Sequence, residues 1–451
     1  MEERAQDFLE ELLQRSLVQV IEKSWDGNCK ICGVHDLVRD MAIHEAREEN
    51  FLTVFTKEDD EMQLSAQKVR RAMLQCSPPT NFGMHSKNAR SLFHFGSYEF
   101  DDKQPNPLSP HLPKLNNHGL RLLKVLFIEG IDLRSENKII HISLLQGLIH
   151  LRYLGIRHCL VPQNFFNIPC NCFKNLETLN FKGTYYKFTH HSLWEVPSLR
   201  YVNLGRLFYE PTCRRRWSMP LMLALDHHSN IQTLKFVMTI KGNSVKKKWQ
   251  NLKSLLKRTE HLVSLAIDHK SSGDVVPLLS EGTRNLLCHK TIQKLFLFGL
   301  WERDLCVLNL GMLPTNLTKL TLEWSGLEED PMPVLERLQS LTILRLWVRS
   351  FEGTELTCSE GGFPRLQKLE LVQLYAISHW NIKKGSMPRL SHLKMVDLYK
   401  LQVFPELQNV PTLRNLELYE GLYEISGQPE NHYKIQHISS VRQLKIRRLY
   451  E

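Results

Sequence analysis

Apolar residues recur along most of the chain in the pattern L-x-x-L-x-L, in which Leu, Ile, Val, Phe or Met occupies each apolar place. From Leu123 to Val441 the copies extend over 318 residues in twelve intervals, about 26.5 residues each, and a period of roughly 20–29 residues is typical of leucine-rich repeats. The thirteen copies begin at Leu123, Leu151, Leu176, Leu199, Ile231, Leu262, Ile292, Leu317, Leu341, Leu366, Leu390, Leu413 and Val441. Two weaker copies precede them, beginning at Val69 and Ala89.

The spacing within each copy predicts a strand that is buried on one face. The last two apolar places are two residues apart, so on a strand both side chains point to the same side. One copy cannot bury this side alone, whereas stacked copies share a continuous core. Prolines before several strands, as at Pro364 and Pro388, favour irregular connecting segments over long helices. We therefore predict an α/β fold, a horseshoe-shaped leucine-rich-repeat solenoid with a parallel β-sheet on its concave face.

The first 55 residues follow other patterns. Apolar residues between Ala5 and Leu13 have helical spacing, and residues 16–21 and 30–34 predict two strands on either side of an Asp26-Gly27 turn. A second helix is predicted over residues 35–49. Helix, hairpin and helix in this order are typical of the end of a winged-helix domain. We predict a winged-helix remnant over residues 1–55, a linker with degenerate first repeats over 56–118, and the repeat domain over 119–451.

Length and charge add to this picture. A chain of 451 residues is too long for one ordinary core, and 42% apolar residues exclude disorder as the main state. The formal charge of +10 is unevenly distributed, because residues 1–60 carry 15 acidic and 7 basic residues and the remainder is therefore +18. We hypothesise that the acidic start and the basic repeats attract each other in a closed, inactive form.

Nothing in the sequence predicts export or membrane insertion. The acidic, amphipathic start is unlike a secretory signal, and no apolar stretch approaches the ~20 residues that a spanning helix needs. The ten cysteines are irregularly spaced, and Asn316-Leu317-Thr318 is a lone glycosylation sequon. These features favour a reducing compartment, so we predict a cytoplasmic or nucleocytoplasmic protein without a membrane span.

Few residues form a pattern that carries chemistry. Cys29, Cys32 and His35 supply only three of the four ligands of a structural zinc site, so no metal is predicted. No spacing predicts a catalytic constellation, and we predict no enzyme activity. Basic runs at residues 214–216 and 246–248 each adjoin a tryptophan, but solvated loop charge or docking to an acidic partner is favoured over nucleic-acid binding.

The residues that alternate with the core along each strand form a candidate binding surface. In the C-terminal half they combine aromatic side chains with Arg and Lys, which resembles the composition of protein-interface hot spots. The candidate residues on this surface are Phe296, Phe298, Trp324, Arg345, Trp347, Tyr375, Lys394, Tyr399 and Tyr419. The alternative is that these aromatic residues only cover the repeat core at the strand ends.

The segments at residues 9–20 and 34–42 resemble plant coiled-coil nucleotide-binding leucine-rich-repeat disease-resistance proteins. The match begins at the end of that family's winged helix and covers its repeat domain. Val34-His35-Asp36 looks like the family's Met-His-Asp motif, with Val in place of Met. The resemblance implies that His35 faces the ADP phosphates in the resting receptor and that Asp36 supports the local packing.

The chain departs from the family where nucleotide binding is concerned. It contains no G-x-x-x-x-G-K-[ST] loop, which would cradle phosphates, so we expect no cofactor in this chain. In the family ADP or ATP binds through an upstream domain. The chain is therefore expected to be a fragment, a partial gene model or a truncated product.

The resemblance implies the recognition and autoinhibitory portion of an intracellular plant immune receptor that triggers defence. Its expected partners are a pathogen effector or a guarded host protein, and the nucleotide-binding module of the same receptor family. Alternatives are a substrate-recognition subunit of a ubiquitin ligase, which would need an F-box that residues 1–55 lack, and a degenerate, non-functional fragment. An extracellular receptor would need a signal peptide, and an independent ATPase would need the missing phosphate loop.

Overall fold

A computed structural model provides the three-dimensional structure of the chain. It describes residues 2–23, 29–55, 69–75, 86–96, 120–131, 133, 147–161, 173–184, 196–204, 230–240, 259–271, 289–298, 310, 313–401, 403, 405–419 and 443–447. The chain divides into two compact units, Met1–Lys187 and Phe188–Glu451.

The first unit begins with the predicted order of helix, hairpin and helix. These elements are α1 (Glu2–Gln14), β1 (Gln19–Lys23), β2 (Cys29–Gly33) and α2 (Asp36–Glu48). Strands β1 and β2 are antiparallel, as a hairpin requires. The imidazole of His35 accepts a hydrogen bond from the backbone of Leu37 and so caps the start of α2.

A parallel sheet follows in the same unit. Its strands are β3 (Thr53–Phe55), β4 (Arg71–Leu74), β5 (Ser91–Phe95), β6 (Val125–Glu129), β7 (Tyr153–Arg157) and β8 (Thr178–Asn180), with a short 3₁₀ helix, η2 (Ser86–Asn88), before β5. Each strand pairs with the next in parallel. The weak copies at Val69 and Ala89 each stand two residues before a strand, so they are structural repeats. The boundaries at residues 55 and 118 stay predictions, although β3 already pairs with β4.

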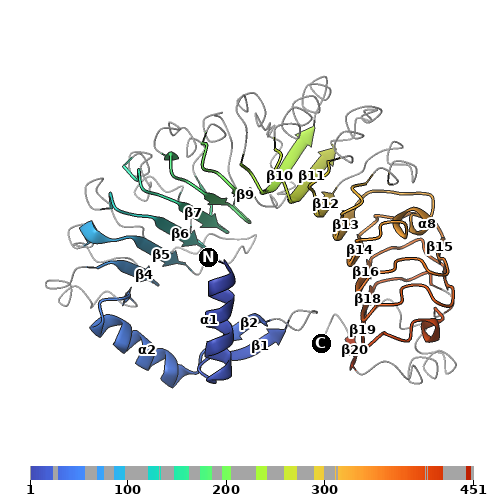
Figure 1. The fold of residues 1–451 in the computed structure, drawn as a ribbon, viewed down its shortest axis with the longest axis horizontal. Helices are drawn as coiled ribbons and strands as arrows, with labels where there is room; N and C mark the ends of the chain where they lie inside the picture. Colours follow the sequence, from blue (N-terminus) through green and yellow to red (C-terminus); the bar gives the residue numbers. More distant parts are fainter. Residues whose placement is uncertain are drawn as a thin grey trace, which may run out of the picture. The chain divides into compact units, whose positions relative to one another are not determined.

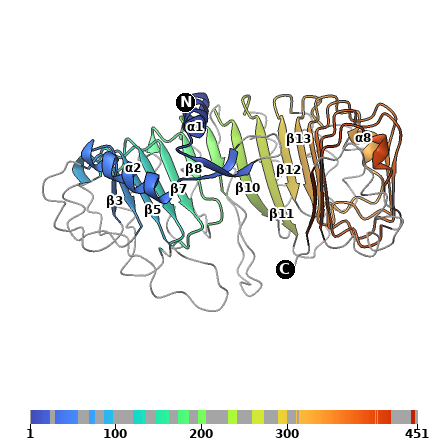
Figure 2. The same cartoon turned by 90° about the horizontal axis from the view of Figure 1, so that it is seen from below.

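The second unit continues the same design. Its strands are β9 (Tyr201–Asn203), β10 (Thr233–Ile240), β11 (Ser264–Ser271), β12 (Lys294–Phe298), β13 (Lys319–Glu323), β14 (Ile343–Trp347), β16 (Lys368–Val372), β18 (His392–Val396), β19 (Asn415–Tyr419) and β20 (Gln443–Arg447). Neighbouring strands are parallel and stand side by side, as Figure 1 shows for β12 to β14 and Figure 2 for β12 and β13. All thirteen predicted copies therefore lead into a strand that the structure describes.

The core is built from the apolar places of the pattern. Leu320, Leu344 and Leu369 stand opposite one another on successive strands, and each is fully buried. Because the register between neighbouring strands is unbroken here, each leucine rests on its counterpart from the next repeat. Both units are thus leucine-rich-repeat structures, and the predicted fold class is confirmed.

The connecting segments in the second unit carry their own small elements. Helix α8 (Met332–Leu335) precedes β14, and β15 (Glu355–Cys358) pairs in parallel with β17 (His379–Ile382) on the side away from the main sheet (Figure 1). A short 3₁₀ helix, η7 (Leu407–Asn409), precedes β19. Before Pro364 and Pro388, Phe363 and Met387 have positive φ angles of 54° and 49° and bury their side chains. The backbone before these two strands is irregular and not helical, as the prolines predict.

Hydroxyl side chains also tie successive repeats together. The Oγ1 atom of Thr318 donates to the carbonyl of Gln293 at 3.0 Å, and that of Thr342 donates to the carbonyl of Thr318 at 2.9 Å. These hydrogen bonds repeat at the point where each strand begins, so they fix the stacking of one repeat on the next.

Candidate functional site

The strand side chains that alternate with the core lie on what we call the open face of each sheet. On β14, Leu344 and Leu346 are buried, whereas Ile343, Arg345 and Trp347 are half-buried. The alternation is the one that the pattern predicts for a strand with one covered side. Every second residue of a strand therefore directs its side chain toward the open face, where a ligand could bind.

Some of these positions are more deeply buried than a plain surface would be. Thr321, Glu323 and Glu370 expose only 2%, 6% and 5% of their area, although all three alternate with the core. Neighbouring strands lie only about 4.8 Å apart, so longer side chains on this face can close over shorter ones.

A charged cluster surrounds Glu370 on the open face of the second unit. Its Oε2 atom lies 3.1 Å from the Nε of Arg345 and accepts a hydrogen bond of 2.9 Å from the indole Nε1 of Trp347. Its Oε1 atom pairs with the Nζ of Lys368 at 2.8 Å. The Arg345 guanidinium also lies over the Trp347 ring, 5.3 Å from its centroid. Arg345 and Trp347 are thus held in place before any partner arrives.

The surroundings of Glu370 keep its carboxylate charged. Burial alone would raise the pKa of Glu370, but Arg345, Lys368 and the Trp347 indole outweigh burial and lower it. A charged carboxylate with both oxygens engaged anchors its neighbours more firmly than a neutral one. Sequence reasoning placed Arg345 and Trp347 on the surface, and the structure adds the group that orients them.

Lys319, on the neighbouring strand β13, has a different environment. It is half-buried, and its pKa falls to about 8, through burial first and then through repulsion by Arg345 and Lys235; attraction by Glu370 opposes the fall, and a smaller repulsion by Lys294 adds to it. Among the described residues no carboxylate lies within ion-pair distance of its amine. This lysine therefore lies among cations without a close counter-charge from the described part of the chain.

One row of the open face alternates in charge from strand to strand. Adjacent residues in this row face one another across parallel pairs, from β14 to β20. The described side chains of the row are those of Arg345, Glu370, Lys394 and Glu417, and the backbone of Lys445 on β20 lies opposite Glu417. The predicted residue Lys394 lies here between two acidic neighbours, so it belongs to a mixed-charge row and not to a basic patch.

The predicted phenylalanines lie on β12, where Phe296 and Phe298 are half-buried on the open face. Trp324 follows β13 in the left-handed region, at a φ of 56°, and is half-buried. The Arg349 guanidinium lies over the Trp324 ring, 5.4 Å from its centroid. Aromatic surface thus lies both on the strands and just beyond their ends.

Tyr375 and Tyr399 come from two successive repeats and stack on each other. Their ring centroids are 5.9 Å apart with an angle of 11° between the planes, and the residues are 38% and 57% exposed. Both rings therefore keep exposed surface, while the alternative that the aromatic residues of the candidate surface only cover the repeat core stays open. The backbone of Tyr419 lies on β19 opposite Val396, whereas its side chain is outside the described residues.

The first unit holds an aromatic group that sequence reasoning missed. Phe127 contacts Phe93, Phe95 and Tyr153 at centroid distances of 6.3, 5.5 and 6.4 Å, and Arg157 lies over its ring at 5.8 Å. The signal was present, because Phe93, Phe95, Phe127 and Arg157 stand at the same offsets from the core positions as Arg345 and Trp347 do, and Tyr153 stands at the offset of Ile343.

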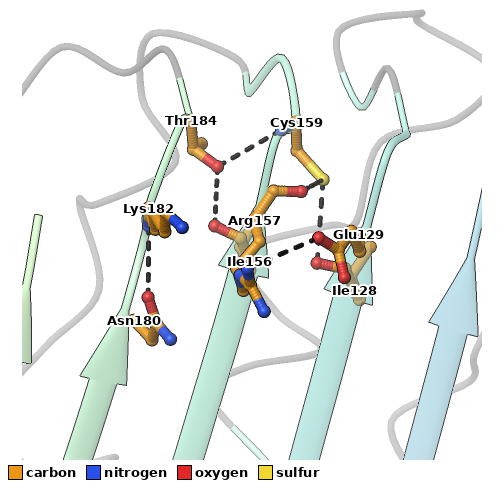
Figure 3. A network of polar contacts seen from close by, with 8 residues as sticks. All are labelled: Ile128, Glu129, Ile156, Arg157, Cys159, Asn180, Lys182 and Thr184. Carbon is orange, nitrogen blue, oxygen red and sulfur yellow. Dashed lines mark hydrogen bonds and ion pairs between the residues drawn. The ribbon is translucent and has the colours of Figure 1, made fainter. Parts of the chain in front are cut away.

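Polar contacts close the strand ends of the first unit (Figure 3). The Oγ1 atom of Thr184 donates to the carbonyl of Ile156 at 2.6 Å and accepts from the backbone N–H of Cys159 at 3.2 Å. The guanidinium of Arg157 pairs with Glu129 at 3.7 Å, and both side chains are about a quarter exposed. These contacts join neighbouring repeats, and we assign them a structural role.

The motif Val34-His35-Asp36 lies at the start of α2 and is exposed. Beyond the cap that His35 provides, Asp36 pairs with Arg39 at 3.2 Å. The described surroundings show a helix-capping role for His35 and a local ion pair for Asp36, and a role of the motif in nucleotide sensing stays a prediction. The absence of a cofactor likewise stays a prediction.

The remaining chemical candidates add no site. Among the described residues no three His, Cys, Asp or Glu side chains gather as metal ligands would, and the prediction of no metal is otherwise untested. The basic runs at residues 214–216 and 246–248 lie outside the described residues. In the described part of the chain, no helix has the length and apolar character that crossing a bilayer requires. The described open faces offer binding surface and no arrangement that we can assign to catalysis.

Comparison with known proteins gives the sequence a context. Residues 1–42 match the family model described as the disease resistance protein winged helix domain. Disease resistance RPP8-like protein 3 of Arabidopsis thaliana is 27% identical over 97% of this chain and 48% of its own length. Disease resistance protein RPP8 of the same plant is 26% identical over 98% of this chain and 49% of its own length. The chain spans about half the length of the curated relatives it matches.

Among solved structures, a leucine-rich-repeat protein of Leptospira interrogans aligns with a TM-score of 0.45 at 15% identity. The alignment covers 88% of this chain and 99% of that chain. Likeness of this degree carries no weight for function.

Proposed function

From the premise that the chain is related along nearly its whole length to plant disease resistance proteins, we propose that it is the recognition and autoinhibitory part of an intracellular plant immune receptor. In this proposal the receptor resides in the cytoplasm, senses a pathogen effector or a guarded host protein, and triggers the defence response. The chain itself contributes binding and performs no catalysis.

The observation that carries this proposal is the prearranged cluster around Glu370. Interface hot spots are enriched in Trp, Tyr and Arg, and they bind best when their side chains are already ordered. Arg345 and Trp347 meet both conditions, because Glu370 holds each of them by a direct polar contact. A protein ligand that lies along the second unit's open face would meet this cluster on β14 and β16.

Exposed apolar residues in the first 51 positions support the second part of the proposal. Phe8, Ile21, Leu37, Met41 and Phe51 are 65%, 70%, 75%, 56% and 56% exposed. Several large apolar side chains exposed on a short segment indicate a surface that a partner covers. Because residues 1–42 match a winged-helix domain of resistance proteins, we assign this surface to the nucleotide-binding module of the same receptor family.

A receptor chimera tests the recognition part. The chain would replace the matching half of RPP8, and the chimera would be expressed in leaf cells together with a library of secreted pathogen proteins. We expect no cell death from the chimera alone and localised cell death with at least one library member. Trp347→Ala should abolish that response, whereas Lys384→Ala, an exposed lysine outside the open face, should preserve it. An unchanged response in Trp347→Ala would contradict the proposal that the open face binds the recognised protein.

The same chimera tests autoinhibition. Leu37→Asp places a charge on the exposed apolar surface without disturbing a buried position, since Leu37 is 75% exposed. We expect this variant to cause cell death without any pathogen protein, because a charged side chain weakens an apolar contact. A variant that remains silent but still responds to the activating library member would show that this surface does not restrain the receptor.

A further inference from the structure

The cations of the second unit's open face are concentrated on one part of the sheet. Lys319 and four further basic residues lie on strands β10 to β16, and Glu323 and Glu370 are the acidic residues on the same face of β13 and β16. The five residues are Lys235, Lys294, Lys319, Arg345 and Lys368.

We propose that Lys319 and the cations beside it form a docking point for a carboxylate side chain in an acidic segment of the protein that the open face recognises. The inference rests on the proposed function and specifies the chemistry of the ligand. The segment binds in extended form across β12 to β16, with an Asp or Glu at Lys319.

The geometry leaves Lys319 available to a ligand. Lys319 lies opposite Lys294 on the neighbouring strand β12 and opposite Ile343 on β14. Neither of these two residues is acidic. Glu370 has both oxygens engaged, with Arg345 at one and Lys368 at the other. The carboxylate of Glu370 is therefore already paired with two cations. A carboxylate of the ligand would supply a counter-charge close to Lys319.

The electrostatics of Lys319 fit a site that is filled on binding. Burial and the neighbouring cations lower its pKa to about 8 in the free chain. A ligand carboxylate would favour the charged amine and reverse that shift. Binding should therefore weaken as the pH rises through about 8, because the amine then loses the proton that attracts the ligand.

The rest of the face favours a polypeptide over a nucleic acid. Beyond Arg345, the row of alternating charge described above contains the acidic residues Glu370 and Glu417 as well as cations. A strand of phosphates carries a negative charge at every step and would meet both carboxylates, whereas a peptide can vary its side chains along the row. Phe296 and Phe298 on β12 offer apolar contact to neighbouring side chains of the same peptide.

A fluorescein-labelled hexaglutamate peptide serves as the probe, with binding to the full chain followed by fluorescence anisotropy at low salt. We expect Lys319→Met and Lys294→Glu each to weaken binding by about tenfold or more, which is the effect of losing one charge-assisted contact. Lys384→Met is the matched control, since Lys384 is an exposed lysine just beyond β17, and it should bind like the unaltered chain. Equal binding by all four proteins, or no binding by the unaltered chain, would overturn the proposal.

The pH provides a second readout that a merely structural role of Lys319 would not produce. Between about pH 7 and pH 9.5 the unaltered chain should lose affinity for hexaglutamate, and Lys319→Arg should not, because arginine keeps its charge over this range. A decline of the same size in Lys319→Arg would place the titrating group elsewhere and overturn the assignment.

A hexathymidylate oligonucleotide distinguishes the other class of ligand. If it bound more tightly than hexaglutamate and lost affinity in Lys319→Met, the docking point would serve phosphates, and the peptide proposal would be wrong. The outcome is separate from that of the receptor chimera. A silent chimera with intact hexaglutamate binding would contradict the receptor function alone, whereas a responsive chimera without hexaglutamate binding would contradict the acidic ligand alone.

Discussion

Replacing Glu370 by glutamine tests the most strongly connected side chain of the open face. The amide keeps the size of the side chain and can still accept the Trp347 hydrogen bond, but it removes the charge that Arg345 and Lys368 share. The substitution therefore isolates the ionic part of the cluster from its packing.

The structure sets the size of the expected effect. The side chain of Glu370 is 6% exposed, and those of Arg345 and Lys368 are 18% and 17% exposed. Removing one partner of a buried ion pair costs about 3–5 kcal/mol because the other charge is left uncompensated. The partial exposure of both cations lets water replace some of the loss, so we expect Glu370→Gln to lower the free energy of unfolding of the second unit by about 2–3 kcal/mol.

Urea unfolding followed by tryptophan fluorescence measures this effect in the relevant unit. Seven of the eight tryptophans lie at Trp194 or later in the chain, so the signal reports chiefly on the second unit. Glu417→Gln is the control, because Glu417 occupies the same row but is only half-buried. The control should cost less than about 1 kcal/mol, as solvent-exposed ion pairs do.

The contribution of Glu370 to the free energy of unfolding should depend on pH. The folded pKa of Glu370 lies below its ordinary value of 4.5, so its stabilisation is fully present above that value and is lost as the pH falls through the folded pKa. The gap in stability between the unaltered chain and Glu370→Gln should therefore close in acid. A gap that is absent at neutral pH, or equal to that of Glu417→Gln, would refute the view that Glu370 organises the cluster.

Three further predictions concern other parts of the chain. Thr184→Val removes two buried hydrogen bonds and should destabilise the first unit by about 1–3 kcal/mol, measured by thermal unfolding with circular dichroism. Gly183→Ala should cost about 1–2 kcal/mol in the same assay, because φ is +72° and a Cβ would lie 2.4 Å from the His158 ring; equal stability would show that the loop adapts. Burial raises the pKa of the Cys358 thiol to about 12, so iodoacetamide should label the exposed Cys32 in the native chain and Cys358 only after unfolding, as mass spectrometry can determine.

The strands could be predicted from the sequence because their signal is local. Leu344 and Leu346 stand two residues apart, and this spacing alone assigns them to one side of a strand. The weak copies at Val69 and Ala89 obey the same rule, and both precede strands. Strand β3, the first strand of the sheet in the first unit, could not be predicted in this way. It has only three residues, and no full copy of the pattern precedes it.

The candidate site could be predicted only in part. Arg345 and Trp347 are adjacent to core positions of one repeat, so the pattern places them on the open face. Glu370, which holds both, belongs to the next repeat, 25 and 23 residues further along the chain. No spacing rule within a repeat predicts which side chains of two repeats will meet, because rotamers and burial decide that contact.

The sequence by itself determined the repeat, the thirteen strands that follow from it and the leucines that fill the core, because each depends on residues that are neighbours along the chain. Only the tertiary structure decided that Glu370 is buried with three partners, that Lys319 lies among cations, and that Phe127 gathers an aromatic group in the first unit. These properties arise from stacking, which brings residues about 25 positions apart to within hydrogen-bond distance and removes water from between them.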